Sequence, residues 1–171
     1  MFKQEVLFNK EECNSILELA TTWKKSSVIY HKNVGPVRNL NRRNSLESKI
    51  KNIDALSDII LNKLRKFNIN SISNDSKILK YIKGSYFTIH KDRVESTPDR
   101  MLTLIIQLSD ENNYTGAELI VGDTIVSKKI GNLILFDSGH YHEVKNLIEG
   151  ERHILVSWIK KENIIKSTNL L

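Results

Sequence analysis

Two histidines and one aspartate are the side chains best suited to hold a reactive metal. His90 and Asp92 stand two residues apart in SYFTIHKD, and His142 follows fifty residues after Asp92 in FDSGHYHEV. Side chains at positions i and i+2 of an extended strand share one face, so both members of the pair can reach one ion. Two histidines and one carboxylate form the facial triad of non-haem ferrous iron, which leaves further coordination positions open for reactants.

The His-x-Asp pair is a weak signal by itself, because with five histidines in the chain such pairs also arise by chance. Structural zinc is a weaker alternative. A closed zinc site would need a fourth ligand, and Cys13 is the one thiolate donor in the sequence. The position of Cys13, one turn before Ile16 and Leu17, instead predicts a small buried residue of a helix.

The second half of the chain contains an ordered series of motifs. In sequence they are YIKGSYFTIHKD, DRMLTLIIQLS, YTGAELIV, IGNLILFDSGHYHEV and GERHILVSW. Over about residues 77–160 they resemble the Fe(II)- and 2-oxoglutarate-dependent dioxygenases, in their prolyl 4-hydroxylase-like branch. The branch pattern Tyr-x-x-Gly-x-x-Tyr-x-x-His-x-Asp is matched except at Phe87, where a tyrosine is usual.

The resemblance implies that His90, Asp92 and His142 bind Fe(II). It also implies that Arg152, ten residues after His142, forms a salt bridge with the distal carboxylate of 2-oxoglutarate. A guanidinium suits this role because its planar fork binds a carboxylate through two parallel hydrogen bonds, which lysine cannot copy.

Further cosubstrate contacts follow from the resemblance. Tyr81 matches a position that commonly hydrogen-bonds 2-oxoglutarate, and Thr103 stands where a small polar residue lines the same pocket. A strand aromatic that simply packs is the alternative interpretation of Tyr81. Gln107 stands where some relatives carry a second tyrosine contact.

Substrate contacts are predicted from residues near the ligands, namely Arg93, Arg100 and the loop residue His140. The segment 93–100 directly follows the first two ligands and is predicted to form a mobile lid over the substrate. His153 follows Arg152 on the same strand, so its side chain is predicted to point away from that of Arg152. It is not assigned to the metal.

Two helices are predicted in the first part of the chain. Asn9 can cap a helix with Glu12 three residues on, and Trp23 is expected at the end of its apolar face. Apolar residues at every third or fourth position predict a second helix from about Ser45 to Phe67. In the polar stretch 30–44 between them, Gly35-Pro36 signals a turn.

From Lys77 onward, short runs of β-branched and aromatic residues predict strands. They are placed near 77–82, 85–90, 101–108, 117–121, 124–127, 133–136, 143–147 and 152–159. The expected fold is mainly β with N-terminal helices (α+β), a double-stranded β-helix of the jelly-roll, cupin-like kind. The 171 residues fit a single domain, with helical support over about 1–76 and the jelly-roll core over about 77–160.

The composition of the chain narrows its possible partners and its cellular location. The formal charge of +6 would suit an acidic ligand or nucleic acid. The basic residues, Arg42 and Arg43 among them, are not interleaved with aromatics and are interpreted mainly as solvated surface. No apolar run approaches the roughly 20 residues that cross a bilayer, so no membrane association is expected. A single cysteine and a start without a secretion signal predict a cytoplasmic location.

The implied activity is hydroxylation of an unactivated C–H bond with Fe(II), 2-oxoglutarate and O2, supported by ascorbate. The expected substrate is a prolyl or other residue of a peptide or protein, or a free amino acid or related metabolite. One alternative is an oxidative demethylase of alkylated nucleic acid, disfavoured because Trp158 replaces the second arginine of such relatives. The other is a cupin-like metal-binding module without oxygenase activity. Oligomeric state is not predicted.

Overall fold

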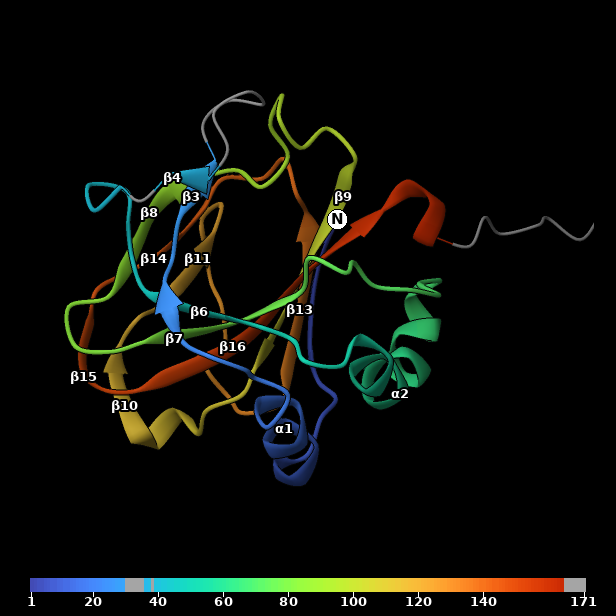
Figure 1. Ribbon diagram of the computed structural model, residues 1–171, viewed down its shortest axis with the longest axis horizontal. Coiled ribbons are helices and arrows are strands. Elements are labelled where there is room, and N and C mark those ends of the chain that lie inside the picture. Colours follow the sequence, from blue (N-terminus) through green and yellow to red (C-terminus); the bar gives the residue numbers. More distant parts are fainter. Residues whose placement is uncertain (30–35, 38, 165–171) are drawn as a thin grey trace, which may run out of the picture.

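The computed structural model describes residues 1–29, 36–37 and 39–164. Its largest feature is an antiparallel seven-stranded major sheet, in the order β1-β13-β9-β16-β7-β6-β2 (Figure 1). These strands are β1 (Phe2–Val6), β13 (Asn132–Asp137), β9 (Arg100–Gln107), β16 (Arg152–Lys160), β7 (Lys77–Tyr81), β6 (Leu46–Lys49) and β2 (Lys24–Lys25).

A five-stranded minor sheet, in the order β12-β11-β14-β8-β5, completes the jelly roll. Its strands are β12 (Thr124–Ile125), β11 (Leu119–Val121), β14 (His142–Val144), β8 (Tyr86–His90) and β5 (Arg43–Asn44). Two short ribbons lie beside the sheets, β10 (Tyr114–Gly116) with β15 (Leu147–Gly150) and β3 (Val28–Ile29) with β4 (Pro36–Val37).

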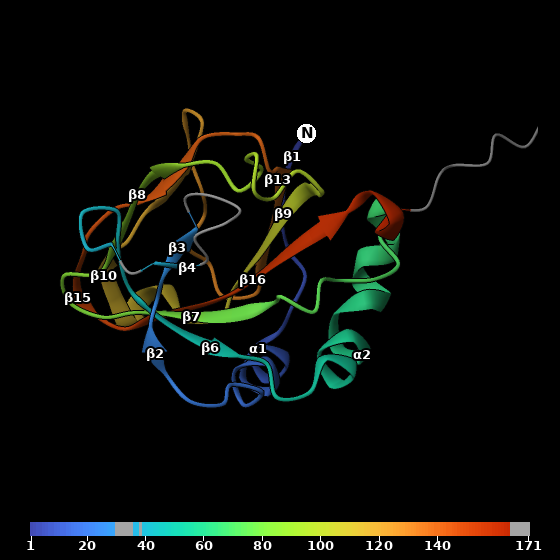
Figure 2. The ribbon, with the colours of Figure 1, turned by 45° about the horizontal axis from the view of Figure 1, so that its top comes forward.

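Two helices cover the outer face of the major sheet, on the side away from β8 (Figures 1 and 2). Helix α1 (Lys10–Leu17) has the predicted capping box, in which Asn9 and Glu12 each accept a hydrogen bond from the other's backbone N–H. Helix α2 (Ile53–Leu64) leads into the 3₁₀ turn η1 (Arg65–Phe67). Cys13 of α1 is fully buried, as predicted.

The alternation of side chains along the major sheet separates two interiors. On β9, Leu104 and Ile106 pack against the helices, whereas Ile105 belongs to the apolar cluster inside the jelly roll. Thr103 and Gln107 share the inward face with Ile105, because side chains two residues apart point to the same side of a strand. The sheet therefore places polar side chains inside the barrel without exposing its helix-covered face.

The predicted start of the second helix is wrong. Leu46–Lys49 forms β6, which pairs with β7, and the helix begins at Ile53 after the Asn52 cap. Glu47 and Ser48 are buried by this pairing, so the strand lacks the alternation of apolar and polar residues that identifies a half-buried strand. Trp23 lies beyond α1 and is partly exposed rather than part of its apolar face.

Each predicted strand of the second half has a counterpart in the structure. The segment 143–147 is divided between β14 and β15. The 3₁₀ turns η2 (Glu111–Asn113) and η3 (Lys161–Asn163) complete the element list. Gly35 of the predicted turn lies outside the described residues. Within the described ranges, no helix is long and apolar enough to span a membrane.

Candidate metal centre and cosubstrate site

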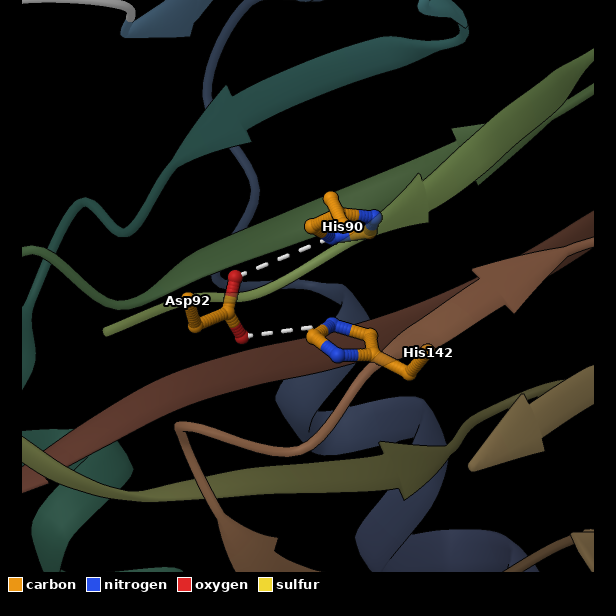
Figure 3. Close-up of side chains that lie close together, drawn as sticks. All are labelled: His90, Asp92 and His142. Atoms are coloured by element: carbon orange, nitrogen blue, oxygen red, sulfur yellow. Dashed lines mark ion pairs between the residues drawn. The ribbon is translucent and has the colours of Figure 1, made fainter. Parts of the chain in front are cut away.

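His90, Asp92 and His142 come together where the interior strands β8 and β14 of the minor sheet end and begin (Figure 3). Strands β8 and β14 are antiparallel neighbours, and their register puts His142 directly opposite His90. One ligand atom from each of the three residues lies within 4.8 Å of the others. The Asp92 carboxylate stands between the rings, with Oδ1 3.7 Å from His90 Nε2 and Oδ2 3.4 Å from His142 Nε2.

Hydrogen bonds to a neighbouring loop fix the position of Asp92. The backbone N–H groups of Asp92 and Arg93 both donate to the Ser138 carbonyl oxygen, at 3.0 and 2.8 Å. Thr103 donates its hydroxyl to Asp92 Oδ2 at 2.8 Å and lies 2.9 Å from the Ser138 hydroxyl. The Thr103 hydroxyl is thus hydrogen-bonded to a metal ligand, and its predicted place in the cosubstrate pocket stays a prediction.

Backbone carbonyls set the orientation of both imidazoles. His90 Nδ1 lies 2.8 Å from the Thr88 oxygen, and His142 Nδ1 lies 3.1 Å from the His140 oxygen. A carbonyl oxygen can only accept, so each Nδ1 carries the hydrogen and each Nε2 presents its lone pair to the shared space. This is the tautomer that a metal ligand needs.

Burial and mutual charge set the protonation of the three side chains. Burial, helped by the nearby His142, lowers the pKa of His90 to about 3, so this ring is neutral at physiological pH. Burial alone would raise the pKa of Asp92, but the histidines and the Thr103 hydrogen bond outweigh it and lower that pKa. Burial opposes protonation of His142, yet the Asp92 carboxylate raises its pKa. Asp92 is therefore the ionised member.

Aromatic rings pack against both histidines. The Phe87 ring stacks on His90 with centroids 3.5 Å apart and 18° between the planes. Phe136 meets His142 edge-on, with centroids 4.9 Å apart. Phe87 occupies the position where the family usually has tyrosine, and this structure gives it the role of holding a ligand ring in place.

The donor set fits ferrous iron. Two imidazoles and one carboxylate converge from one side, and the other side opens into a cavity of about 320 Å³. A closed zinc site would require a fourth protein ligand, and no further histidine, cysteine or carboxylate joins the group within the described residues.

Arg152 offers an unused donor inside the barrel. It is the first residue of β16, its side chain is 0% exposed, and its Nε and Nη2 donate to Gln107 Oε1 at 3.1 and 3.0 Å. Nη1 is buried and has no hydrogen-bond partner among the described residues. A buried cation with a free N–H group fits an anionic carboxylate, since such a group is costly when left unpaired.

Tyr81 lies beside this arginine. The register of β7 and β16 places Tyr81 opposite Arg152, whose Cζ is 5.4 Å from the tyrosine ring centroid. Tyr81 is almost completely buried and lines the cavity. Burial raises the pKa of its phenol, while the charges of Arg43 and Arg152 act in the opposite direction. The phenol is thus a neutral hydrogen-bond donor.

The predicted substrate residues have separate environments. Arg100 lines the cavity. Arg93 forms an ion pair with Asp137, with Nη2 2.6 Å from Oδ1. His140 is exposed and contributes its carbonyl oxygen rather than its ring to the centre. The backbone N–H of His153 donates to Ser109, and its ring lies beside Trp23.

The predicted lid, 93–100, is a series of hydrogen-bonded turns. Thr97 donates its hydroxyl to the Asp92 carbonyl oxygen at 2.7 Å, and the Arg100 N–H donates to the Thr97 carbonyl. Val94, Ser96, Thr97 and Arg100 line the cavity, so the segment forms part of its wall.

Arg43 is the main functional candidate that the sequence did not reveal. Its interpretation as solvated surface is wrong, since the residue is 9% exposed and lines the cavity, with its guanidinium 4.6 Å from the Phe87 centroid. The position of β5 next to β8 brings it there. A basic pair in a polar stretch gives no signal of such burial, because the pairing is between segments far apart in sequence.

A jelly roll that carries two histidines and one carboxylate beside a buried arginine has the fold and ligand set of a non-haem iron oxygenase. The profile of the 2OG-Fe(II) oxygenase superfamily matches residues 76–160. The chain belongs to this superfamily, in its prolyl 4-hydroxylase-like branch. Its cofactors are therefore Fe(II) and 2-oxoglutarate, with O2 as oxidant, and the predictions of family, fold and enzyme class are confirmed.

Individual relatives agree with this assignment. A PKHD-type hydroxylase of Prochlorococcus marinus (strain MIT 9312) is 26% identical over 86% of this chain and 69% of its own length. One from Shewanella baltica (strain OS155) is 34% identical over 47% of this chain, which spans 40% of that relative.

A prolyl hydroxylase from Trichoplax adhaerens, solved with a peptide fragment of the hypoxia inducible factor oxygen degradation domain, has a similar fold. The TM-score is 0.69 at 16% identity, over 94% of this chain and 84% of the other.

Proposed function

We propose that this chain hydroxylates an unactivated C–H bond, with Fe(II) held by His90, Asp92 and His142 and with 2-oxoglutarate anchored by Arg152. One observation carries the proposal: the three ligand atoms converge on a cavity inside the same barrel as a buried arginine with a free N–H group. When bound, the iron and 2-oxoglutarate supply the oxidant, by oxidative decarboxylation of the cosubstrate to succinate.

The protein's own groups position and shield these reactants. The Thr103 hydroxyl holds the Asp92 carboxylate, and the Ser138 carbonyl holds the Asp92 backbone N–H. The Thr88 and His140 carbonyls orient the two imidazoles. The unpaired Nη1 of Arg152 would donate to the distal carboxylate, with the neutral Tyr81 phenol as a second donor. No side chain has to remove a proton from the substrate.

A peptide or protein residue, prolyl above all, is our first candidate substrate, with a free amino acid as the second. The Trichoplax adhaerens enzyme of the same fold was solved with a peptide, which supports the first. We also propose that residues 1–171 act as one domain, because α1 and α2 share a core with the major sheet. A single cysteine, fully buried, suits the reducing cytoplasm, where we place the protein.

The test is turnover of 2-oxoglutarate to succinate by purified protein with Fe(II), O2 and ascorbate. It is combined with a screen of peptides and amino acids for a mass gain of one oxygen atom. We expect succinate formation that stops in His142→Ala. Lys129→Gln, an exposed residue outside the cavity, is the matched control. Absence of turnover, or turnover unchanged in His142→Ala, would contradict the proposal.

A further inference from the structure

The walls of the cavity carry more positive charge than the iron chemistry uses. Five lining side chains are cations, whereas Asp92 is the only lining carboxylate within the described part of the chain. The cations are Arg42, Arg43, Lys77, Lys91 and Arg100.

Iron and cosubstrate do not neutralise this excess. The two positive charges of Fe(II) and the charge of Arg152 balance the carboxylate of Asp92 and the two carboxylates of 2-oxoglutarate. Lys77 has its own partner, because its Nζ lies 3.4 Å from the buried Glu47 carboxylate. The remaining cations therefore face a loaded centre that has no net charge, and a neutral prolyl ring would leave them unused.

Arg43 has an unsatisfied group in this wall. Its Nε donates to Ser45 Oγ at 2.9 Å and its Nη1 to the Ser27 carbonyl at 3.4 Å. Its Nη2 is buried without a hydrogen-bond partner among the described residues, and no described carboxylate forms an ion pair with it. An arginine buried in this way is stabilised by an anionic ligand.

Arg100 supplies a second free guanidinium. Its Cζ lies 3.6 Å from the Trp158 ring centroid, a stacked arrangement that leaves the planar N–H edge available. Burial lowers the pKa of Arg100. The adjacent Asp99 pairs with Lys160 instead, at 2.7 Å. Across the described ranges, no side-chain hydrogen bond or ion pair involves the Arg100 guanidinium.

We propose that the substrate carries a carboxylate, which the guanidinium groups of Arg43 and Arg100 bind inside the cavity. The assignment rests on the proposed hydroxylase function and narrows its substrate to acidic molecules. The carboxylate can belong to an aspartyl or glutamyl side chain, or to the α-carboxylate of a free amino acid or peptide end. Both sources offer the planar pair of oxygens that matches an arginine fork.

A phosphate of nucleic acid fits less well. The excess charge lies in the walls of a cavity of about 320 Å³, and nucleic-acid backbones are bound by basic patches or grooves that follow them. An amino acid or one acidic side chain can enter such a space, whereas a continuous strand cannot.

The experiment measures binding rather than turnover. Protein loaded with Mn(II) in place of Fe(II) and saturated with 2-oxoglutarate is titrated calorimetrically with three probes. N-acetylglutamate α-amide carries only a side-chain carboxylate, N-acetylglutamine only an α-carboxylate, and N-acetylglutamine amide carries none. We expect at least one acidic probe to bind about tenfold to a hundredfold more tightly than the neutral probe. The acidic probe that binds more tightly identifies the source of the carboxylate.

Substitutions of the two arginines test whether their guanidinium groups bind the carboxylate. Arg43→Gln and Arg100→Gln should each weaken the preferred acid about tenfold or more, while Lys129→Gln removes an exposed charge outside the cavity and should not. Thermal melts identify any variant that fails to fold, and the comparison of probes on the unmodified protein does not depend on them.

The proposal is overturned if the three probes bind equally or neither acid binds. It is also overturned if the acidic probe displaces 2-oxoglutarate, or if the acidic probe still binds more tightly than the neutral probe after both arginine substitutions. Tighter binding of a single-stranded oligonucleotide than of the acidic probes would overturn it as well. Succinate formation without added substrate tests the hydroxylase function separately, so failure of one proposal is distinguishable from failure of the other.

Discussion

The two faces of the major sheet are built from the same strands but bury different chemistry. Toward α1 and α2, Leu104, Ile106 and Leu155 form a continuous apolar core. Toward the minor sheet, the same strands present Arg152 and Thr103, both fully buried, among apolar neighbours. The helix-covered face can gain stability from apolar burial alone, whereas the inner face retains polar groups that would destabilise an ordinary core.

The largest expected effect comes from the helix-covered face. Ile106→Ala should lower the free energy of unfolding by about 2–5 kcal/mol, because a fully buried side chain leaves a void between sheet and helices. Urea denaturation measures this, and Mn(II) affinity of the folded protein should not change. Ile105→Ala, one position along, should cost less, since Ile105 already borders the cavity. Equal losses of unfolding free energy in the two variants would contradict the difference proposed between the two faces of the major sheet.

Removal of the inner arginine should affect binding instead. Arg152→Gln should raise the KM for 2-oxoglutarate about tenfold to a hundredfold, through loss of the cation and of its charge-assisted hydrogen bond. Its free energy of unfolding should change less than that of Ile106→Ala, because the Arg152 Nη1 is already unpaired. Succinate assays at varied 2-oxoglutarate and urea denaturation give the two quantities. An unchanged KM would assign the cosubstrate to one of the cations that line the cavity.

A smaller effect is expected from Thr103, which acts on the metal only through the ligand Asp92. Thr103→Val removes the hydrogen bond to Asp92 Oδ2 and should weaken Mn(II) binding about tenfold. Thr88→Val is the matched control, because the Thr88 hydroxyl is buried without a partner and the residue holds His90 through its carbonyl. Equal metal affinities for the two variants would show that the Thr103 hydroxyl does not position the carboxylate.

The smallest effect is a dependence of metal affinity on pH. Asp92 raises the pKa of His142 above its usual value near 6.5, so protons compete with the metal for Nε2 at higher pH than at an unperturbed histidine. Below that raised pKa, affinity should fall by up to about tenfold for each pH unit. Mn(II) titrations between pH 8 and pH 6, about the range of His titration, measure the slope. A constant affinity across this window would contradict the prediction.

The same contrast between the faces explains what the sequence reveals. Strands such as β9 and β16 are identified by their β-branched and aromatic residues, and the triad by ligand spacing along strands. Strand β6 is not, because Glu47 and Ser48 are buried by pairing with β7 rather than by apolar contact. Arg43 is missed for a related reason: its burial depends on β5 meeting β8, which no local pattern encodes.

The hydrogen bonds between the Ser138 carbonyl and the backbone of Asp92 and Arg93 have a consequence for how the sequence of such a protein can change in evolution. Asp92 and His142 belong to segments fifty residues apart, yet the Ser138 carbonyl accepts hydrogen bonds from the Asp92 and Arg93 N–H groups, close to where β14 begins. Because this contact is local, the exposed turn 122–123 between β11 and β12 can lengthen without moving the ligands. Doubling a loop costs only about 0.6 kcal/mol in closure entropy. Insertions there offer a route to new substrate surfaces around an unchanged iron site.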